Sequence, residues 1–174
     1  MSESGLWPQL LELSRLDHGP VTRRLAADAD ARERIARALE LDRLGRLEAE
    51  LEISPWLDGA RVIGTWSADI EQTCGVTLEP LESVLSGKFE LKILPAGSPN
   101  APQTDEESVL DPEAEDPPDL IEGQRLDLGA LVVEQLSLNI DPFPRKPGAV
   151  FEAPEAEQPP SPFAVLQGFK ARPR

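Results

Sequence analysis

Two stretches of the chain place apolar residues at helical spacing. In residues 28–41, either Asp28 or Asp30 can cap a helix whose apolar positions form one narrow stripe. In residues 128–140, apolar positions extend onto several sides, which predicts a helix packed on more than one face. We therefore expect two helices. Their apolar positions are Ala31, Ile35, Ala38 and Leu39 in the first, and Leu128, Leu131, Val132, Val133, Leu136, Leu138 and Ile140 in the second.

The second helix has clear signals at both ends. The Asp127 carboxylate can accept the free N–H groups of its first turn. Pro142 ends it, because proline has no N–H and keeps Asp141 out of the helical conformation. Residues 141–148 then form a short, stiff segment with a basic tip, which we call the hook. We predict that the hook contacts a partner, although a turn that only closes the domain would have the same sequence. Its residues are Asp141, Pro142, Phe143, Pro144, Arg145, Lys146, Pro147 and Gly148.

Strict alternation of apolar and polar residues predicts strands elsewhere. Residues 46–53 put leucine, alanine and isoleucine on one face and glutamates on the other, residues 61–72 repeat the alternation, and residues 88–94 would pair with them. A weaker first strand, using Leu11, Leu13 and Val21, flanks the His18-Gly19-Pro20 turn. Short strands joined by turns favour an antiparallel sheet. The predicted fold class is α+β, with the helices packed on the sheet. Strand order and closure into a barrel stay open.

Two stretches are too rich in proline and acid to pack. Residues 97–119 carry prolines and carboxylates without a basic residue, and residues 152–160 have a similar composition. Such sequences bury too little apolar surface to offset chain entropy. We therefore expect one domain over residues 1–151 with a disordered acidic insertion at about 97–119, then a linker over 152–160. In the last segment, 161–174, Ser161 can cap a short helix, and Pro162 and Phe163 come next in its first turn. This segment either docks on a partner or folds back on its own domain.

Charge is distributed unevenly along the chain. The net charge of −15 argues against general nucleic-acid binding, which depends on lysine and arginine. Basic residues gather towards both ends of the sequence. They are either ordinary surface charge or a basic face, formed when the ends meet, that could contact RNA. The early ones are Arg15, Arg23, Arg24, Arg32, Arg34, Arg37, Arg43 and Arg46, and the late ones are Arg145, Lys146, Lys170, Arg172 and Arg174.

Candidate chemistry is sparse. The one cysteine, Cys74, excludes an internal disulfide and an all-cysteine zinc site, and the one histidine, His18, is distant in sequence, so a catalytic pair is not expected. Cys74 is predicted to be a small, partly buried apolar residue. A flexible acidic run does not hold carboxylates at a fixed separation, and no nucleotide-binding, metalloprotease or hydrolase motif occurs. We expect no enzyme activity, metal, cofactor or small-molecule substrate. Without a signal peptide or an apolar run of membrane-spanning length, a cytoplasmic protein is expected.

Four segments together resemble a known family. They are ADIEQTCGVTLEP at 68–80, RLDLGALVVEQL at 125–136, DPFPRKPG at 141–148 and SPFAVL at 161–166. In order and spacing they are similar to the YceD-like large ribosomal RNA subunit accumulation proteins, in the form typical of alphaproteobacteria, from about residue 60 onward. Many relatives carry C-x-x-C at the position of Cys74. This chain has Thr77 at the second cysteine position, so the resemblance carries over no zinc site.

The resemblance implies a non-enzymatic role in large-subunit ribosomal RNA accumulation or processing, during assembly of the large subunit. In that hypothesis the hook meets the pre-ribosomal large subunit, through a ribosomal protein, its RNA or both, and Pro162 and Phe163 add contacts from the last segment. The alternative hypothesis is an acidic adaptor that binds a basic ribosomal protein or assembly enzyme without touching RNA. Its support is the net charge, the acidic insertion and the face formed by Glu48, Glu50 and Glu52.

Overall fold

The computed structural model describes residues 5–102 and 117–151, and these residues form two sheets and three helices. The larger sheet has the order β2-β3-β4-β5-β6, and the smaller one pairs β1 with β7. Neighbouring strands are antiparallel except β5 and β6, which are parallel. In chain order the elements are β1 (Leu10–Glu12), the 3-10 helix η1 (Leu13–His18), β2 (Val21–Ala26), α1 (Ala29–Ala38), β3 (Arg43–Trp56), β4 (Gly59–Thr73), β5 (Pro80–Pro95), β6 (Asp119–Ile121), β7 (Arg125–Asp127) and α2 (Leu128–Asn139).

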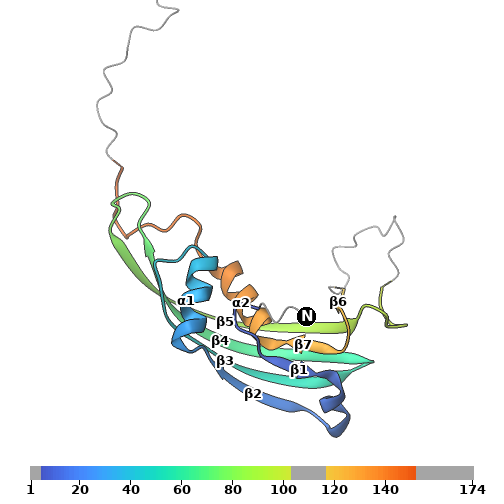
Figure 1. The fold of residues 1–174 in the computed structure, drawn as a ribbon. Helices are drawn as coiled ribbons and strands as arrows, with labels where there is room; N and C mark the ends of the chain where they lie inside the picture. Colours follow the sequence, from blue (N-terminus) through green and yellow to red (C-terminus); the bar gives the residue numbers. More distant parts are fainter. Residues whose placement is uncertain (1–4, 103–116, 152–174) are drawn as a thin grey trace, which may run out of the picture.

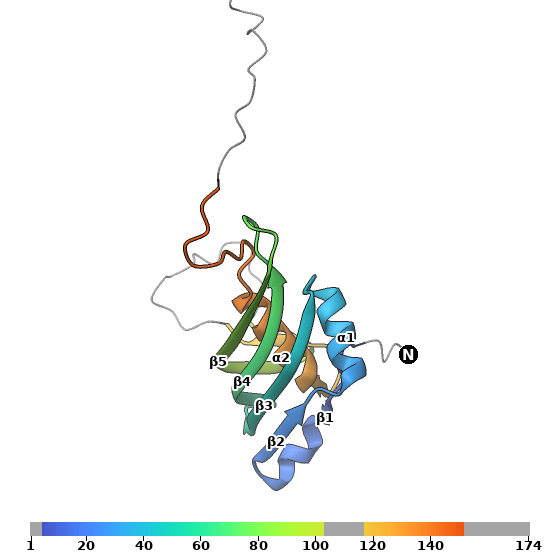
Figure 2. The same cartoon turned by 90° about the vertical axis from the view of Figure 1, so that its left-hand side faces the viewer.

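The larger sheet is open and curved, which confirms the α+β class without barrel closure in the described residues (Figure 1). Helix α2 lies on its concave side and packs against β5 and β1, while α1 packs against β3. In Figure 2 the outer face of β3, β4 and β5 is towards the viewer, with α2 behind it. The core therefore lies between the concave face and the helices. Its most deeply buried side chains include Ile35, Leu47, Leu51, Ile53, Val62, Ile93, Leu126, Leu128, Val132 and Leu136.

Two glycines make room for aromatic rings inside the sheet. Gly87 pairs with Trp66, and a Cβ on Gly87 would lie 2.8 Å from the indole Nε1. Gly64 pairs with Phe89, and a Cβ there would lie 2.6 Å from the phenyl ring. Small residues opposite large ones let each ring lie flat across the neighbouring strand. Both rings are buried as a result.

The predicted helices begin where expected. Asp28 caps α1 by accepting from the Ala31 amide at 2.8 Å, and Asp127 caps α2. Helix α1 ends at Ala38, short of the predicted limit, because Glu40 adopts φ +55° and turns the chain towards β3. The buried residues of α2 share one broad face of the helix, and Leu138 on another side is exposed, so the prediction of packing on more than one face was wrong.

The strand predictions were right for β3 and β4 and incomplete elsewhere. The expected burial alternation is present in β3. Strand β5 begins at Pro80, well before the predicted start at Lys88, because its pairing with β4 extends that far. The sequence did not predict this first half, since Ser83 and Gly87 interrupt the alternation of apolar residues. The predicted first strand was wrong. Leu11 and Val21 lie on strands of different sheets, and Leu13 starts η1.

Much of the predicted insertion and both C-terminal segments, 152–160 and 161–174, lie outside the described residues. The described part reaches past the expected start of the insertion at residue 97. Ser98 Oγ and Asn100 Nδ2 both donate to Asp58 Oδ1, at 2.8 and 2.9 Å, so this end of the insertion is tied to the β3–β4 turn. These two hydrogen bonds lower the pKa of Asp58, with the bond from Asn100 contributing most.

Candidate functional site

The start of α2 is fixed to the N-terminal segment of the chain. Asp127 Oδ1 accepts from the amides of Gly129 and Ala130 in the first turn, and also from the Gln9 amide at 2.9 Å. The Leu128 amide donates to the Gln9 carbonyl at 3.0 Å. Gly129 lies so close to this segment that a Cβ would overlap the carbonyl oxygen of Trp7. Helix α2 therefore starts from a rigid base.

The hook follows α2 and is shaped by two local turns. Asp141 Oδ1 accepts from the Phe143 amide at 2.8 Å, which is the short-range bond that aspartate commonly makes in turns. The Ala149 amide donates to the Lys146 carbonyl at 3.0 Å, and Gly148 between them has φ +78°. Only glycine adopts that conformation at no steric cost. Sequence features within the hook thus determine its two bends.

Contacts with the loop between β4 and β5, residues 74–79, hold the hook in place. The Gly75 amide donates to the Pro144 carbonyl at 2.9 Å, and the Lys146 amide donates to Cys74 Sγ at 3.3 Å. The Lys146 ammonium forms an ion pair with Glu79 at 2.9 Å. At the base of the hook, Gln72 Nε2 donates to the Asp141 carbonyl at 3.0 Å. Together these contacts fix the hook from Asp141 to Lys146. We call the hook and this loop the hook–hairpin surface.

Cys74 is the buried centre of this junction. Its Sγ accepts from the Thr77 amide at 3.5 Å and from the Lys146 amide. The Thr77 side chain, and then the backbone N–H groups of Thr77, Lys146 and Val76, lower the pKa of the Cys74 thiol to about 6, although burial opposes the shift. Cys74 is fully buried, which exceeds the partial burial that was predicted, and it acts as a hydrogen-bond acceptor and not only as an apolar side chain.

The described structure does not bring a catalytic pair together. The short helix η1, which ends at His18, lies at the opposite end of the molecule from the β4–β5 loop (Figure 1). The Cys74 thiol is buried, so a substrate has no direct access to it. Among the described residues, no group of three histidine, cysteine or acidic side chains could hold a metal ion.

Two different kinds of side chain lie on the exposed part of the hook. Phe143 is 76% exposed, and Arg145 is exposed with no ion-pair partner among the described residues. Lys146 is only 34% exposed and pairs with Glu79, where the ion pair lowers the pKa of the Glu79 carboxyl. The basic tip of the hook is therefore divided, because Lys146 is held by Glu79 whereas Arg145 is available to a partner. On the facing loop, Leu78 is 77% exposed.

Sequence reasoning missed the loop that receives the hook. Gln72, Gly75 and Glu79 hold the hook, but nothing local in the sequence distinguishes them from other residues of a hairpin. The only available signal was that residues 68–80 and 141–148 both belong to the family motifs. The predicted contact residues Pro162 and Phe163 lie outside the described residues.

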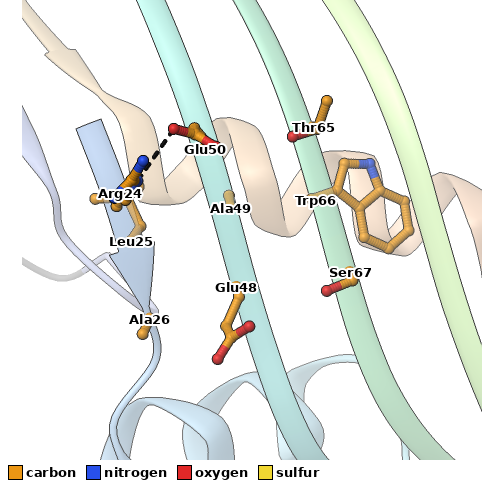
Figure 3. Close-up of a pocket in the computed structure, with 9 residues that line it drawn as sticks. All are labelled: Arg24, Leu25, Ala26, Glu48, Ala49, Glu50, Thr65, Trp66 and Ser67. Carbon is orange, nitrogen blue, oxygen red and sulfur yellow. Dashed lines mark hydrogen bonds and ion pairs between the residues drawn. The ribbon is translucent and has the colours of Figure 1, made fainter. Parts of the chain in front are cut away.

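The outer face of the sheet is a separate feature. A shallow hollow of about 480 Å³ spans β2, β3 and β4. Its lining combines polar residues such as Arg24, Glu50 and Thr65 with the apolar residues Leu25, Ala26, Ala49 and Trp66 (Figure 3). Glu50 pairs with Arg24 at 3.1 Å, and Glu48 pairs with Arg46 at 3.1 Å. The predicted acidic face is therefore partly neutralised by arginines of the same sheet. It has no grouping of acid, base and nucleophile that would support catalysis.

Half of the early arginines are paired with carboxylates in the described structure. Arg43 contacts both Glu71 and Glu82 at 2.9 Å, and Arg46 contacts Asp69 at 2.9 Å. On α1, Arg37 pairs with Glu33 at 2.7 Å, as expected for an i,i+4 pair. For these arginines the pairs favour ordinary surface charge. Within the described residues, no ion pair is formed by Arg15, Arg23, Arg32 or Arg34.

Comparison with known families identifies the chain. A model described as "Large ribosomal RNA subunit accumulation protein YceD" matches residues 62–170, which is more than half of the sequence. The chain belongs to the YceD family. The matched YceD region starts in β4 and includes β5, α2 and the whole hook–hairpin surface. Membership assigns a role in large-subunit ribosomal RNA accumulation, and the family description names an accumulation factor, not a class of enzyme.

Comparison with curated proteins and with solved structures gives no further similar protein. No curated protein and no solved structure gives a significant match. Within residues 5–102 and 117–151, no helix is both long enough and apolar enough to cross a membrane.

Proposed function

We propose that this YceD-family protein promotes processing of large-subunit ribosomal RNA and assembly of the large subunit by binding the pre-ribosomal particle through its hook–hairpin surface. The observation that carries the proposal is the fixed hook. Its backbone is held by Gly75, Cys74 and Gln72, while Phe143 and Arg145 remain exposed. Within the described part of the chain, Arg145 has no ion-pair partner. A surface ordered before binding loses less conformational entropy when its partner arrives.

The exposed side chains suit a pre-ribosomal particle. An aromatic ring can stack on an unpaired base, and an arginine can contact a phosphate at the same time. The same pair can also fill an apolar pocket and meet a carboxylate on a ribosomal protein. The net charge of −15 opposes binding to loose RNA, so recognition depends on the local surface and not on bulk attraction.

The proposed role is structural and non-enzymatic, and we place it in the cytoplasm, where the large subunit of bacteria assembles. Its support is the family description together with the burial of Cys74 within the hook–hairpin surface. The four motif segments further support membership in the form of the family found in alphaproteobacteria.

The acidic adaptor is less well supported. Two of the three glutamates behind it, Glu48 and Glu50, already have arginine partners in the sheet. The acidic insertion that would supply the remaining charge lies largely outside the described residues. RNA contact in the experiments below would argue against the adaptor, because an adaptor meets only protein.

Complementation of a depleted strain tests the proposal. Cells that lack the endogenous protein receive the wild type, Phe143→Ala, Arg145→Ala or the control Arg125→Ala. Arg125 is a suitable control because it is also an exposed arginine of the matched region, but it lies on β7. We expect both hook variants to lower the ratio of mature to precursor large-subunit RNA. We also expect a smaller large-subunit peak in their ribosome profiles, whereas Arg125→Ala should match the wild type in both measurements. Normal RNA and subunit profiles with both hook variants would refute the proposal.

A further inference from the structure

Most of one edge of β5 has no strand beside it in the described structure. Strand β5 pairs with β4 from Pro80 to Ile93, whereas β6 covers only Ile93–Pro95 on the other side. No other described segment donates or accepts a backbone hydrogen bond along residues 81–92. At about 3.3 Å per residue, this open edge is roughly 40 Å long.

The middle of the open edge, between Glu82 and Lys88, has little of the protection that edge strands usually carry. The register between β4 and β5 runs without a bulge, and no charged residue lies between Glu82 and Lys88. Val84, in the middle, is 73% exposed. Proline at the start and β6 at the end close only the two extremities. Unpaired N–H and C=O groups along such an edge are a template for another strand.

The sequence of β5 is complementary to itself in one antiparallel register. We propose that a second copy of this chain adds its β5 to this edge, with a two-fold axis at Leu85. Glu82 of each copy then faces Lys88 of the other, and Val84 faces Ser86. In the same register, Leu81 of one copy is opposite Phe89 of the other. A symmetric contact of this kind uses every attractive pair twice.

Neighbouring registers fit less well. An axis at Ser86 would place Glu82 opposite Glu90, which are like charges. An axis at Gly87 would place Leu81 opposite Ile93, whose edge is already occupied by β6. With the axis at Leu85, the paired segment 80–90 stays inside the open edge.

The two charged residues are able to meet a second copy. Glu82 is 77% exposed although it also contacts Arg43, and Lys88 is exposed with no ion-pair partner among the described residues. The paired segment begins at Pro80, directly after the loop of the hook–hairpin surface, and includes no residue of that surface.

Sedimentation velocity of the full chain, from micromolar to millimolar concentration, tests the pairing. We expect a dimer whose dissociation constant rises about tenfold with Glu82→Lys or with Lys88→Glu, because each change places like charges opposite each other twice. The double variant restores opposite charges and is expected to recover the wild-type dissociation constant. Glu134→Lys and Arg125→Glu are matched controls, since they change net charge equally on α2 and β7.

The outcomes separate cleanly. All these side chains are exposed, so circular dichroism is expected to show an unchanged fold in every variant. A monomer at all concentrations would overturn the proposal, even if another protein adds a strand to this edge. The proposal would also be overturned if the dissociation constant is unchanged in both Glu82→Lys and Lys88→Glu, or if the double variant does not recover the wild-type dissociation constant.

Discussion

Replacing Gly129 by alanine sets two physical effects against each other. Gly129 is the second residue of α2, where alanine has the better helix propensity by up to about 1 kcal/mol. However, a Cβ at this position would overlap the carbonyl oxygen of Trp7. The obstacle is backbone and not the end of a flexible side chain, so it cannot rotate away. Overpacking of this kind typically costs about 1–3 kcal/mol.

Relief of the overlap would also loosen the base of α2. Moving the two segments apart stretches the bond from the Leu128 amide to the Gln9 carbonyl and the bond from the Gln9 amide to Asp127. Each bond contributes about 1 kcal/mol. The clash and these losses outweigh the propensity gain, and we expect Gly129→Ala to lower the free energy of unfolding by about 1–3 kcal/mol.

Urea unfolding followed by circular dichroism measures this difference. The matched control is Gly97→Ala, since a Cβ on Gly97 meets nothing within 4 Å and its φ is not positive. The control is expected to be neutral or stabilising by up to about 1 kcal/mol. If Gly129→Ala is as stable as the control, the close approach of α2 to Trp7 is not present and the argument for a rigid base fails.

Two further predictions concern the helix and the junction. Leu136→Ala removes a fully buried side chain of α2 and should lower the free energy of unfolding in urea by about 2–5 kcal/mol. Leu138→Ala, at an exposed position, should change it by less than about 0.5 kcal/mol. Equal losses in the two variants would contradict the orientation of α2. Hydrogen bonds hold the pKa of the folded Cys74 thiol at about 6, below its ordinary value of 9.0, so the ionised thiol favours the folded junction. Its stabilisation is complete above pH 9 and is lost as pH falls through about 6, so the stability difference between wild type and Cys74→Ala should grow from pH 6 to 9; a pH-independent difference would refute this role.

Local signals account for the elements that the sequence predicted well. Asp127 and Pro142 mark the two ends of α2 within a few residues of the helix itself, and alternation alone identifies β3 because one face of that strand is buried. The first half of β5 lacked such a signal. Ser83 and Gly87 occupy positions where apolar residues would continue the pattern, and pairing with β4 determines the strand instead.

The candidate site depends on contacts that no local pattern encodes. The hook was recognisable from its prolines and glycine, but the loop that receives it comes from residues far earlier in the chain. Lys146 and Cys74 are separated by 72 positions. Arg145 and Lys146 are adjacent basic residues, and the sequence alone makes them equally good candidates for contact with a partner. Only the fold distinguishes them, because Glu79 of the β4–β5 loop pairs with Lys146.

Site-specific photocrosslinking in growing cells tests the central claim most directly. A photoreactive amino acid replaces Phe143 at the exposed part of the hook, and in a control chain it replaces Leu57, which is also exposed but lies in the β3–β4 turn at the other end of β4. The account predicts crosslinks from position 143 to large-subunit ribosomal RNA or to a protein of the pre-ribosomal large subunit, and far fewer from position 57. Equal labelling from the two positions, or an absence of pre-ribosomal crosslinks from position 143, would contradict it.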